Sequence, residues 1–367
     1  LGIGPWRAFF TVSLPLARPA IATGVALALM ETLADYGTVA YFAVNTFTTG
    51  IYRAWFSLGD RIASAQLAAI LLGFVLLLVA VERITRGRAR YHNTSNRPRP
   101  SAGRLRGSAA LLASLACLTP LALGFLLPAG LLLRMALGEG DAQFGERFAI
   151  LARNSFTLAG LTALVAVMLA VVLAYSARLS KTLLAQGLNR LVGLGYAVPG
   201  TVIAVGVLIP VTRLDNWLAG QWESAFGSNP GLLLTGGIAA LIYAYLARFL
   251  SVALQTVETS LSKITPSMDD AARSLGLGQG PTLRRVHLPI LRGSLFTAGL
   301  LVFVDVMKEL PATLVMRPFN FDTLATQAYT LASDERLAEA STAALAIVAV
   351  GLLPLIALSR QISLARK

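Results

Sequence analysis

A polar island between two long apolar runs determines how the rest of the chain is interpreted. It reads Asp270-Ala271-Ala272-Arg273-Ser274-Leu275-Gly276, and nine residues later Val286-His287-Leu288-Pro289 follows. Its first part, Ser267–Leu275, is predicted to be a short helix with Ser267 or Asp269 as N-cap and Gly276 at its C-terminal stop. Because glycine tolerates a positive φ, the chain can turn sharply there. The island therefore predicts a compact helical loop between two membrane spans.

This spacing resembles the "EAA" loop of ABC-importer permeases, in which acid-Ala-Ala and Gly are followed by Ile-x-Leu-Pro. Asp270 stands here where Glu is usual, and Val286 where Ile is usual. In that family the loop enters a groove of the ATPase subunit. The resemblance implies coupling to a cytoplasmic ABC ATPase, present in two copies, through Asp270, Ala271, Ala272, Gly276, Leu288 and Pro289. The alternative is an ordinary amphipathic loop helix.

The chain opens with a second copy of the end of this motif. Gly4 precedes Pro15 by eleven residues, as Gly278 precedes Pro289. Without a gap, the two stretches pair Arg18 with Arg292, Thr23 with Thr297, Glu31 with Asp305, Asp35 with Glu309, Thr49 with Thr323, Ala54 with Ala328 and Asp60 with Asp334. This register predicts an internal repeat, a common construction of transporters. Gly2, Leu14 and Pro15 are then the coupling residues of the first copy. We expect the chain to be N-terminally truncated within that copy.

The composition predicts an all-α polytopic membrane protein. Apolar residues make up 56% of the chain and charged residues 13%, and a helix needs about 20 apolar residues to cross a bilayer. The apolar runs predict eight transmembrane helices: Ala20–Phe42, Ile62–Val81, Ala109–Leu133, Ser155–Tyr175, Leu191–Val211, Leu232–Val252, Gly293–Met316 and Ala340–Leu358. The lone cysteine, Cys117, excludes a disulfide framework.

The charge pattern predicts the orientation of these spans. The linker Glu82–Gly107 is rich in arginine and is therefore expected to be cytoplasmic. Alternation of the spans adds the island and the C-terminus to that side. The opposite side receives the acidic residues Asp60, Glu139, Asp141, Glu146, Asp215, Glu223, Asp322, Asp334, Glu335 and Glu339. The net charge of +13 is thus explained by membrane orientation, and nucleic-acid binding is not expected.

The linker divides the chain into two unequal units. Residues 1–82 are predicted to be the C-terminal remnant of a first permease repeat, with two spans and the end of its coupling loop. Residues 83–107 form the basic linker. Residues 108–367 are a complete second repeat with six spans and a coupling loop over 255–291. Two such units about a pseudo-two-fold axis normal to the membrane resemble the type I ABC-importer permeases.

Four acidic residues lie within predicted spans. Glu31 and Asp35 are four residues apart, as are Asp305 and Glu309, so each pair shares one helix face. An ionised group in hydrocarbon costs at least about 2.5 kcal/mol, and such groups therefore usually face protein or an aqueous path. If the halves are two-fold related, the four carboxylates can converge as a substrate path for a hard cation such as Fe³⁺. The structural alternative is that Lys308 neutralises one acid and that the rest extend outward to the membrane surface or pair with Arg317.

A more specific resemblance is to the fused permeases of bacterial ferric-iron ABC importers. It is carried by Met307–Thr313, Arg317–Thr326 and Ala332–Arg336, and in the first unit by Glu31–Phe42 and Thr48–Tyr52. It implies iron transport across the bacterial inner membrane and a periplasmic iron-binding protein as partner. No tightly bound metal is expected. Fused thiamine permeases share this architecture, so thiamine or another small solute is the alternative cargo.

Enzymatic functions find little support in the sequence. It contains no Gly-x-x-x-x-Gly-Lys-Ser/Thr phosphate loop, so we expect no cofactor on this chain and ATP hydrolysis by a separate subunit. The two histidines, His92 and His287, are far apart in the sequence, and no His-Glu-x-x-His motif is present. A proton-coupled secondary transporter is the remaining alternative, since repeats and buried carboxylates also suit that class.

Overall fold

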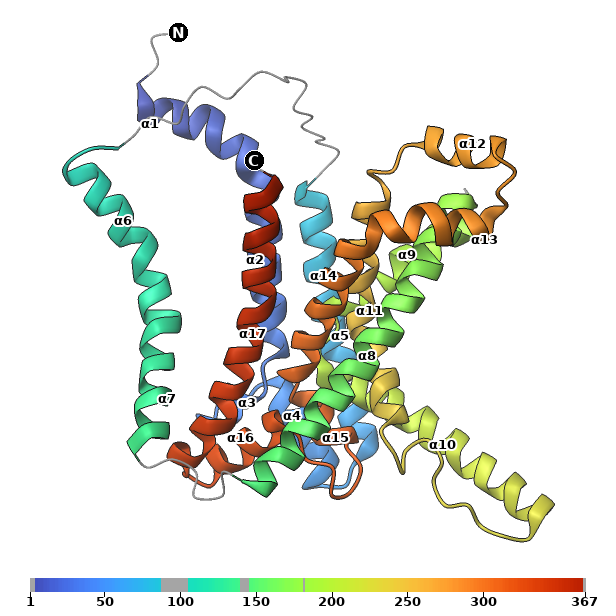
Figure 1. Ribbon diagram of the computed structural model, residues 1–367. Coiled ribbons are helices and arrows are strands. Elements are labelled where there is room, and N and C mark those ends of the chain that lie inside the picture. The colour runs from blue at the N-terminus through green and yellow to red at the C-terminus, as the bar shows by residue number, and fades with distance from the viewer. Residues whose placement is uncertain (1–3, 87–104, 139–144, 181, 366–367) are drawn as a thin grey trace.

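The computed structural model describes residues 4–86, 105–138, 145–180 and 182–365. Within these ranges every regular element is a helix (Figure 1). Eight helices are long and apolar enough to cross a membrane: Trp6–Ala34, Arg61–Thr85, Ser108–Gly138, Glu146–Leu179, Gly200–Phe226, Ala239–Leu261, Gln279–Met307 and Leu337–Ile356. The predicted all-α polytopic fold is confirmed.

The first unit is built from six elements. They are α1 (Pro5–Ala8), the π-helical turn η1 (Phe9–Ser13), α2 (Leu14–Ala34), α3 (Gly37–Tyr41), α4 (Phe47–Phe56) and α5 (Arg61–Arg86). Helix α5 continues to Arg86, past the predicted end of the first unit at residue 82, through residues that contain neither glycine nor proline. Most of the predicted linker, residues 87–104, lies outside the described residues.

The second unit holds the remaining elements. They are α6 (Ser108–Leu121), the π-helical turn η2 (Ala122–Leu126), α7 (Leu127–Gly138), α8 (Glu146–Leu179), α9 (Leu183–Val192), the 3-10 turn η3 (Gly195–Ala197), α10 (Gly200–Phe226), α11 (Ala239–Leu261), α12 (Pro266–Ser274), α13 (Gln279–Thr282), the π-helical turn η4 (Leu283–His287), α14 (Leu288–Met307), α15 (Pro311–Met316), α16 (Leu324–Ser333) and α17 (Leu337–Ala365).

The fifth span differs from its prediction over Leu191–Val211. The spanning helix α10 begins only after Pro199, which adopts an extended backbone with ψ 144° as the N-cap. Proline has no N–H to donate to a preceding turn, so a helix that reaches it from the N-terminal side ends earlier. The residues before it form the separate helix α9 and the turn η3. The predicted segment therefore joined the end of one helix to the start of another.

The helix boundaries repeat along the chain. The starts of α1, η1, α2 and α3 lie 274 residues before the starts of α13, η4, α14 and α15. A π-helical turn thus precedes the long helix in both copies, and in each it leads into a Leu-Pro pair, Leu14-Pro15 or Leu288-Pro289. The predicted internal repeat is visible in the backbone itself over these elements.

The predicted register is wrong beyond α3 and α15. Helices α4 and α16 have the same length, but their starts are 277 residues apart, because in the second copy α15 is one residue longer than α3 and the loop after it is two residues longer. Both helices begin with a threonine capping box, formed by Thr46 with Thr49 and by Thr323 with Thr326. The true partner of Thr323 is therefore Thr46. The predicted pairs Thr49–Thr323, Ala54–Ala328 and Asp60–Asp334 do not hold.

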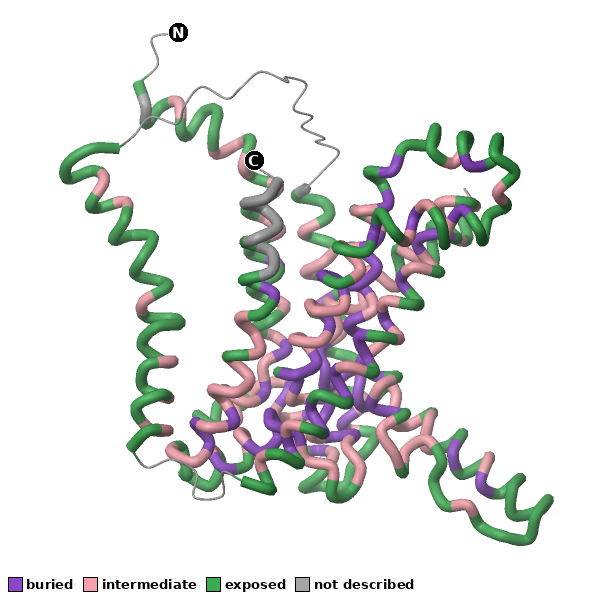
Figure 2. Tube along the Cα trace, viewed as in Figure 1, coloured by how far each residue is buried: buried purple, intermediate pink, exposed green. Residues whose placement is uncertain are grey.

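The core of the second unit lies where α8, α11 and α14 pack together, shown as the dense buried region of Figure 2. Helix α8 contributes the buried small residues Ala159, Ala163, Ala166 and Ala170, which recur every three or four positions. Small side chains on one helix face let neighbouring backbones approach closely in a membrane. The first unit packs on the second chiefly through α5 against α10, in a smaller, separate cluster that contains Ala68, Leu71 and Val205.

An aromatic cluster also joins the two units. Tyr36 follows α2, and its ring lies 4.7 Å from the ring of Tyr52 on α4 and 5.5 Å from that of Tyr329 on α16. Its hydroxyl lies 3.1 Å from that of Tyr329. Tyr52 and Tyr329 are equivalent once the register is shifted to 277 residues. The two helices thus place equivalent rings on either side of one tyrosine.

The elements separate into two ends of the helix bundle (Figure 1). Helix α12 lies at the same end as α1 and the C-terminal end of α17, whereas α4, α15 and α16 lie at the opposite end. This arrangement agrees with the alternation of spans used to predict orientation. Asp215, one of the acids assigned to the side opposite the linker, is not a surface residue. It lies within α10, fully buried, and accepts hydrogen bonds from the backbone amides of Leu233, Leu234 and Thr235 at 2.8–3.0 Å and from the Thr235 hydroxyl at 2.6 Å.

Candidate functional site

The predicted coupling island forms the helix α12. It begins with Thr265 as N-cap and Pro266 in its first turn, so neither Ser267 nor Asp269 is the N-cap that the sequence predicted. Proline is favoured there, because its missing N–H would have no helical partner in any case. At the other end Gly276 has φ +78°, and the Leu277 amide donates to the Ala272 carbonyl at 3.0 Å. The predicted glycine stop therefore has the left-handed geometry of a helix C-terminus.

Asp269 anchors α12 to the bundle. Arg178, at the end of α8, donates two hydrogen bonds of 2.7 and 3.0 Å to the Asp269 carboxylate and two more to the carbonyls of Leu261 and Ile264. The buried ring of His287 lies 2.7 Å from the other carboxylate oxygen. Although burial opposes ionisation, the bonds and charge of Arg178, with His287, hold the pKa of Asp269 below its usual value.

The predicted coupling residues differ in their accessibility. Asp270 and Ala271 are exposed, and Asp270 pairs with Arg273 at 2.9 Å. Ala272 is buried, so it packs inward instead of facing a partner as the motif suggested. Leu288 and Pro289 open α14, and Leu14 and Pro15 open α2. Gly2 lies outside the described residues.

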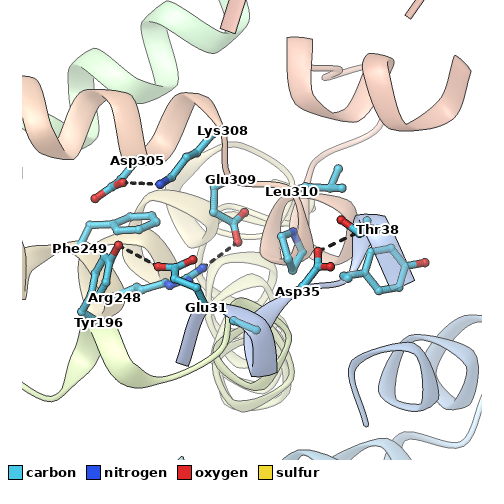
Figure 3. A pocket seen from close by; sticks show the side chains of 14 residues that line it. Glu31, Asp35, Thr38, Tyr196, Arg248, Phe249, Asp305, Lys308, Glu309 and Leu310 are labelled. Carbon is cyan, nitrogen blue, oxygen red and sulfur yellow. Dashed lines mark hydrogen bonds and ion pairs between the residues drawn. The ribbon is translucent and has the colours of Figure 1, made fainter. Parts of the chain in front are cut away.

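A cavity of about 360 Å³ lies where the first unit meets the second. The four predicted carboxylates, of Glu31, Asp35, Asp305 and Glu309, all line it (Figure 3). They meet there because both long helices stop at equivalent places: α2 ends at Ala34 and α14 ends at Met307. In the second copy the stop follows from Pro311, which has no N–H to donate to Met307. The predicted spans Ala20–Phe42 and Gly293–Met316 are thus each interrupted beside the cavity.

Glu309 is the most deeply buried of the four acids, with a side chain that is only 1% exposed. Its carboxylate accepts hydrogen bonds from the Ala312 and Thr313 amides at 3.0 and 3.1 Å and from the Thr313 hydroxyl at 2.9 Å. These donors open α15, so Glu309 satisfies the free N–H groups of that helix. Arg248 of α11 lies 3.5 Å from the same carboxylate.

The other three acids are more accessible and less strongly held. Glu31 accepts a hydrogen bond of 2.9 Å from the Tyr196 hydroxyl. Asp35 accepts one of 3.4 Å from the Thr38 amide, at the start of α3. Asp305 pairs with Lys308 at 3.0 Å, as the structural alternative anticipated for one acid. Arg317, the other cation considered for this role, pairs instead with Asp322 outside the cavity.

Two residues with polar side chains line the cavity without having been predicted from the sequence. Arg248 and Tyr196 both line it, and neither was among the predicted site residues. Arg248 could have been found, because it is an ionisable residue within the predicted span Leu232–Val252, and such residues are rare without a role. Tyr196 offered no comparable signal. Four carboxylates against two cations leave the lining with a surplus of negative charge.

Across the ranges that the structure describes, no three His, Cys, Asp or Glu side chains lie close enough together to hold a metal ion. The carboxylates are spread along the lining, each with a different partner.

Comparisons with known proteins relate the chain to transport permeases. No family model matches it. It is 28% identical to the Fe(3+)-transport system permease protein FbpB 2 of Haemophilus influenzae, over 98% of this chain and 69% of that protein. It is 26% identical to the putative 2-aminoethylphosphonate transport system permease protein PhnV of Salmonella typhimurium, over 45% of this chain and 56% of the relative.

Solved structures agree on the fold. A bacterial ABC transporter that imports the acidic polysaccharide alginate matches with a TM-score of 0.52 and 19% identity, covering 69% of this chain and 95% of that chain. The same kind of transporter, in complex with an alginate pentasaccharide-bound periplasmic protein, matches with a TM-score of 0.50 and 17% identity, covering 69% and 94%. By sequence this chain is related to transport-system permeases, and its fold is similar to that of chains in a bacterial alginate ABC transporter.

Proposed function

We propose that this multi-pass chain is the permease subunit of an ATP-driven importer that moves ferric iron into the cytoplasm by alternating access. The similarity to a ferric permease along nearly the whole chain carries this proposal. The cavity supports it independently, because it is lined by carboxylates with a surplus of negative charge. Carboxylate oxygens are hard ligands that suit a hard cation such as Fe³⁺.

The proposed orientation places α12 in the cytoplasm of a bacterium. Arg83, Arg178, Arg273, Arg284 and Arg285 lie at or near the α12 end of their helices. The inner membrane retains such an excess of arginine on its cytoplasmic side. The C-terminus, which follows α17 at the same end, is then also cytoplasmic. The opposite end, with α4, α15 and α16, faces the periplasm.

In this proposal α12 transmits ATP binding and hydrolysis from a separate ATPase subunit, present in two copies. The exposed Asp270 and Ala271 would form the contact, while Asp269 and Arg178 transmit the movement to α8. This chain contributes no nucleotide site. A periplasmic iron-binding protein would deliver the cargo at the opposite end, as a periplasmic protein is bound in the alginate transporter structure.

The coupling role is tested with two glycine variants of the complete transporter. Gly276→Leu puts a side chain on a backbone of φ +78° and should separate ATPase activity from uptake. Gly278→Ala is the matched control, because Gly278 has φ −72° and open surroundings. If Gly276→Leu retains both ATPase co-purification and uptake, α12 is not the coupling element.

The cargo is tested with the complete transporter in proteoliposomes. Iron delivered with its binding protein should stimulate ATP hydrolysis and accumulate in the lumen, and dissipating a proton gradient should not stop it. Thiamine serves as the competitor from the alternative family. A second competitor is 2-aminoethylphosphonate, the solute named for one relative. Its amine could pair with Glu31 and its phosphonate with Arg248, which line the same cavity. Stimulation by either, with none by iron, would overturn the ferric assignment.

A further inference from the structure

Arg248 is a cation in the lining of the cavity, and its guanidinium group has hydrogen-bond donors without an acceptor in the described protein. It lies on α11 and is about nine-tenths buried. Its guanidinium carbon lies 5.2 Å from the centre of the Phe249 ring and 6.0 Å from that of Tyr196. Among the described residues, its Nε atom has no hydrogen-bond partner. An arginine carries five N–H donors, so most of its capacity is unused.

Glu309 does not supply the missing acceptor. Its two oxygens already accept three hydrogen bonds from the start of α15. The remaining contact, from Arg248 Nη1 to Glu309 Oε1, is 3.5 Å long, which is beyond the usual 2.7–3.2 Å (roughly) of an N–H···O bond. Glu309 therefore compensates the charge of Arg248 but does not accept hydrogen bonds of normal length from its guanidinium N–H groups.

The other acids that line the cavity have the reverse character. Within the part of the chain that the structure describes, neither Glu31 nor Asp35 has a cation within ion-pair distance, while Asp305 is neutralised by Lys308. Figure 3 shows Glu31 and Arg248 on the lining of the same space. The cavity thus offers unpaired carboxylates and a guanidinium fork together. Its volume of about 360 Å³ exceeds what a bare metal ion needs.

We propose that Arg248 is an anion subsite, so that the cargo in this cavity is a ferric ion together with a small oxyanion. The inference rests on the proposed ferric function and adds a second component to the cargo. Glu31 and Asp35 face the metal ion, and the guanidinium of Arg248 binds two oxygens of the anion, a geometry that suits phosphate or carboxylate. The anion thereby lowers the charge that has to enter the hydrocarbon region with the metal.

The subsite is tested by double-label uptake in proteoliposomes that contain the complete transporter with its ATPase and binding protein. The probes are radioactive iron and, in separate runs, labelled inorganic phosphate, carbonate and citrate. We expect one of these anions to accumulate in proportion to iron. Arg248→Gln should reduce both signals more than tenfold, and Arg248→Lys should restore part of them, because lysine keeps the charge but loses the fork.

A matched variant separates binding from stability. Arg248→Gln leaves Glu309 without its cation, so Arg248→Gln combined with Glu309→Gln provides a neutral pair with a similar packing volume. If the double variant has wild-type abundance and thermal stability but remains without anion uptake, the subsite is supported. Iron uptake that carries none of the three anions, or that persists in Arg248→Gln, overturns the subsite alone. Absence of iron uptake in the wild-type transporter overturns the ferric proposal, and the subsite with it.

Discussion

The acids of the two repeat copies occupy equivalent positions but different environments. Asp35 and Glu309 both follow the end of a long helix and both accept a bond from the amide three residues later. Glu309 is buried, with two further bonds and Arg248 beside it, whereas Asp35 is partly exposed with one long bond. In the second copy, Glu309 is engaged in contacts that stabilise the structure. In the first copy, the Asp35 carboxylate remains accessible from the cavity.

Two sequence differences explain this divergence. Thr313, whose hydroxyl bonds Glu309, is replaced by Val39 in the first copy, so Asp35 has no hydroxyl partner there. Lys308, which neutralises Asp305, is replaced by the buried Ala34. The repeat therefore conserves where acids stand and not what they do. Function is then expected to depend on the acids of the first unit and stability on those of the second.

The largest expected effect is on stability. Glu309→Ala should lower the free energy of unfolding by about 3–5 kcal/mol, because it leaves Arg248 buried without a counter-ion. Asp35→Ala should cost at most about 1 kcal/mol, the usual value of a helix-capping side chain. SDS titration of the purified protein in mixed micelles measures both. Equal costs for the two variants would remove the distinction between the copies.

A second pair of variants probes the packing around Glu309. A Cβ atom on Gly200 would collide with Glu309 Oε1 and lie 3.2 Å from Arg248 Nη1, so Gly200→Ala should cost about 1–3 kcal/mol. The control is Gly37→Ala in the first unit, where the Cβ would lie 3.1 Å from a terminal methyl of Leu310 that can move. We expect less than about 1 kcal/mol there. The same unfolding measurement applies, and a costlier Gly37 variant would contradict the comparison.

The third effect is on transport. Glu31→Gln combined with Asp35→Asn should reduce the initial rate of iron uptake about tenfold, which corresponds to about 1.4 kcal/mol. Asp305→Asn combined with Lys308→Gln removes a charge pair of the second unit and should change the rate by less than about threefold. Both double variants preserve side-chain size, and membrane abundance is measured alongside uptake. A larger loss in the second variant would place the cargo path on the other copy.

The smallest effect concerns α12 and its anchor, which includes His287, a residue whose position in the first copy is occupied by Ser13. The pKa of Asp269 is lowered in the folded protein despite burial, chiefly by Arg178. Its stabilisation is therefore complete above the unfolded pKa of about 3.9 and is lost as the pH falls through the lower folded value.

Asp269→Asn should accordingly cost about 1 kcal/mol at neutral pH. The difference from the wild type should shrink toward zero as the pH is lowered from 7 toward 2. Thermal unfolding midpoints of both proteins across that range provide the measurement. A difference that persists in acid would mean that the bond geometry, and not the carboxylate charge, anchors α12.

Much of the architecture followed from the sequence alone. The length and polarity of the apolar runs predicted eight spans, because a fixed hydrocarbon thickness selects helices of fixed length. The spacing from Asp270 to Pro289, matched at the start of the chain, predicted the repeat. Gly276 predicted a left-handed stop, since few other residues adopt positive φ. All these are local or periodic properties, which a linear pattern can carry.

The tertiary structure decided what each charged residue does. The four acids look alike in sequence, yet Glu309 is engaged at the start of α15 while Glu31 faces the cavity. That difference depends on Arg248, which lies about sixty residues away from Glu309 along the chain and meets it only when α11 packs beside α15. The sequence pattern also did not reveal that the repeat register shifts by three residues before α16. A few added residues between two helices have little effect on the pattern of apolar residues. Burial and ion pairing arise from contacts between distant segments, so only the folded chain determines them.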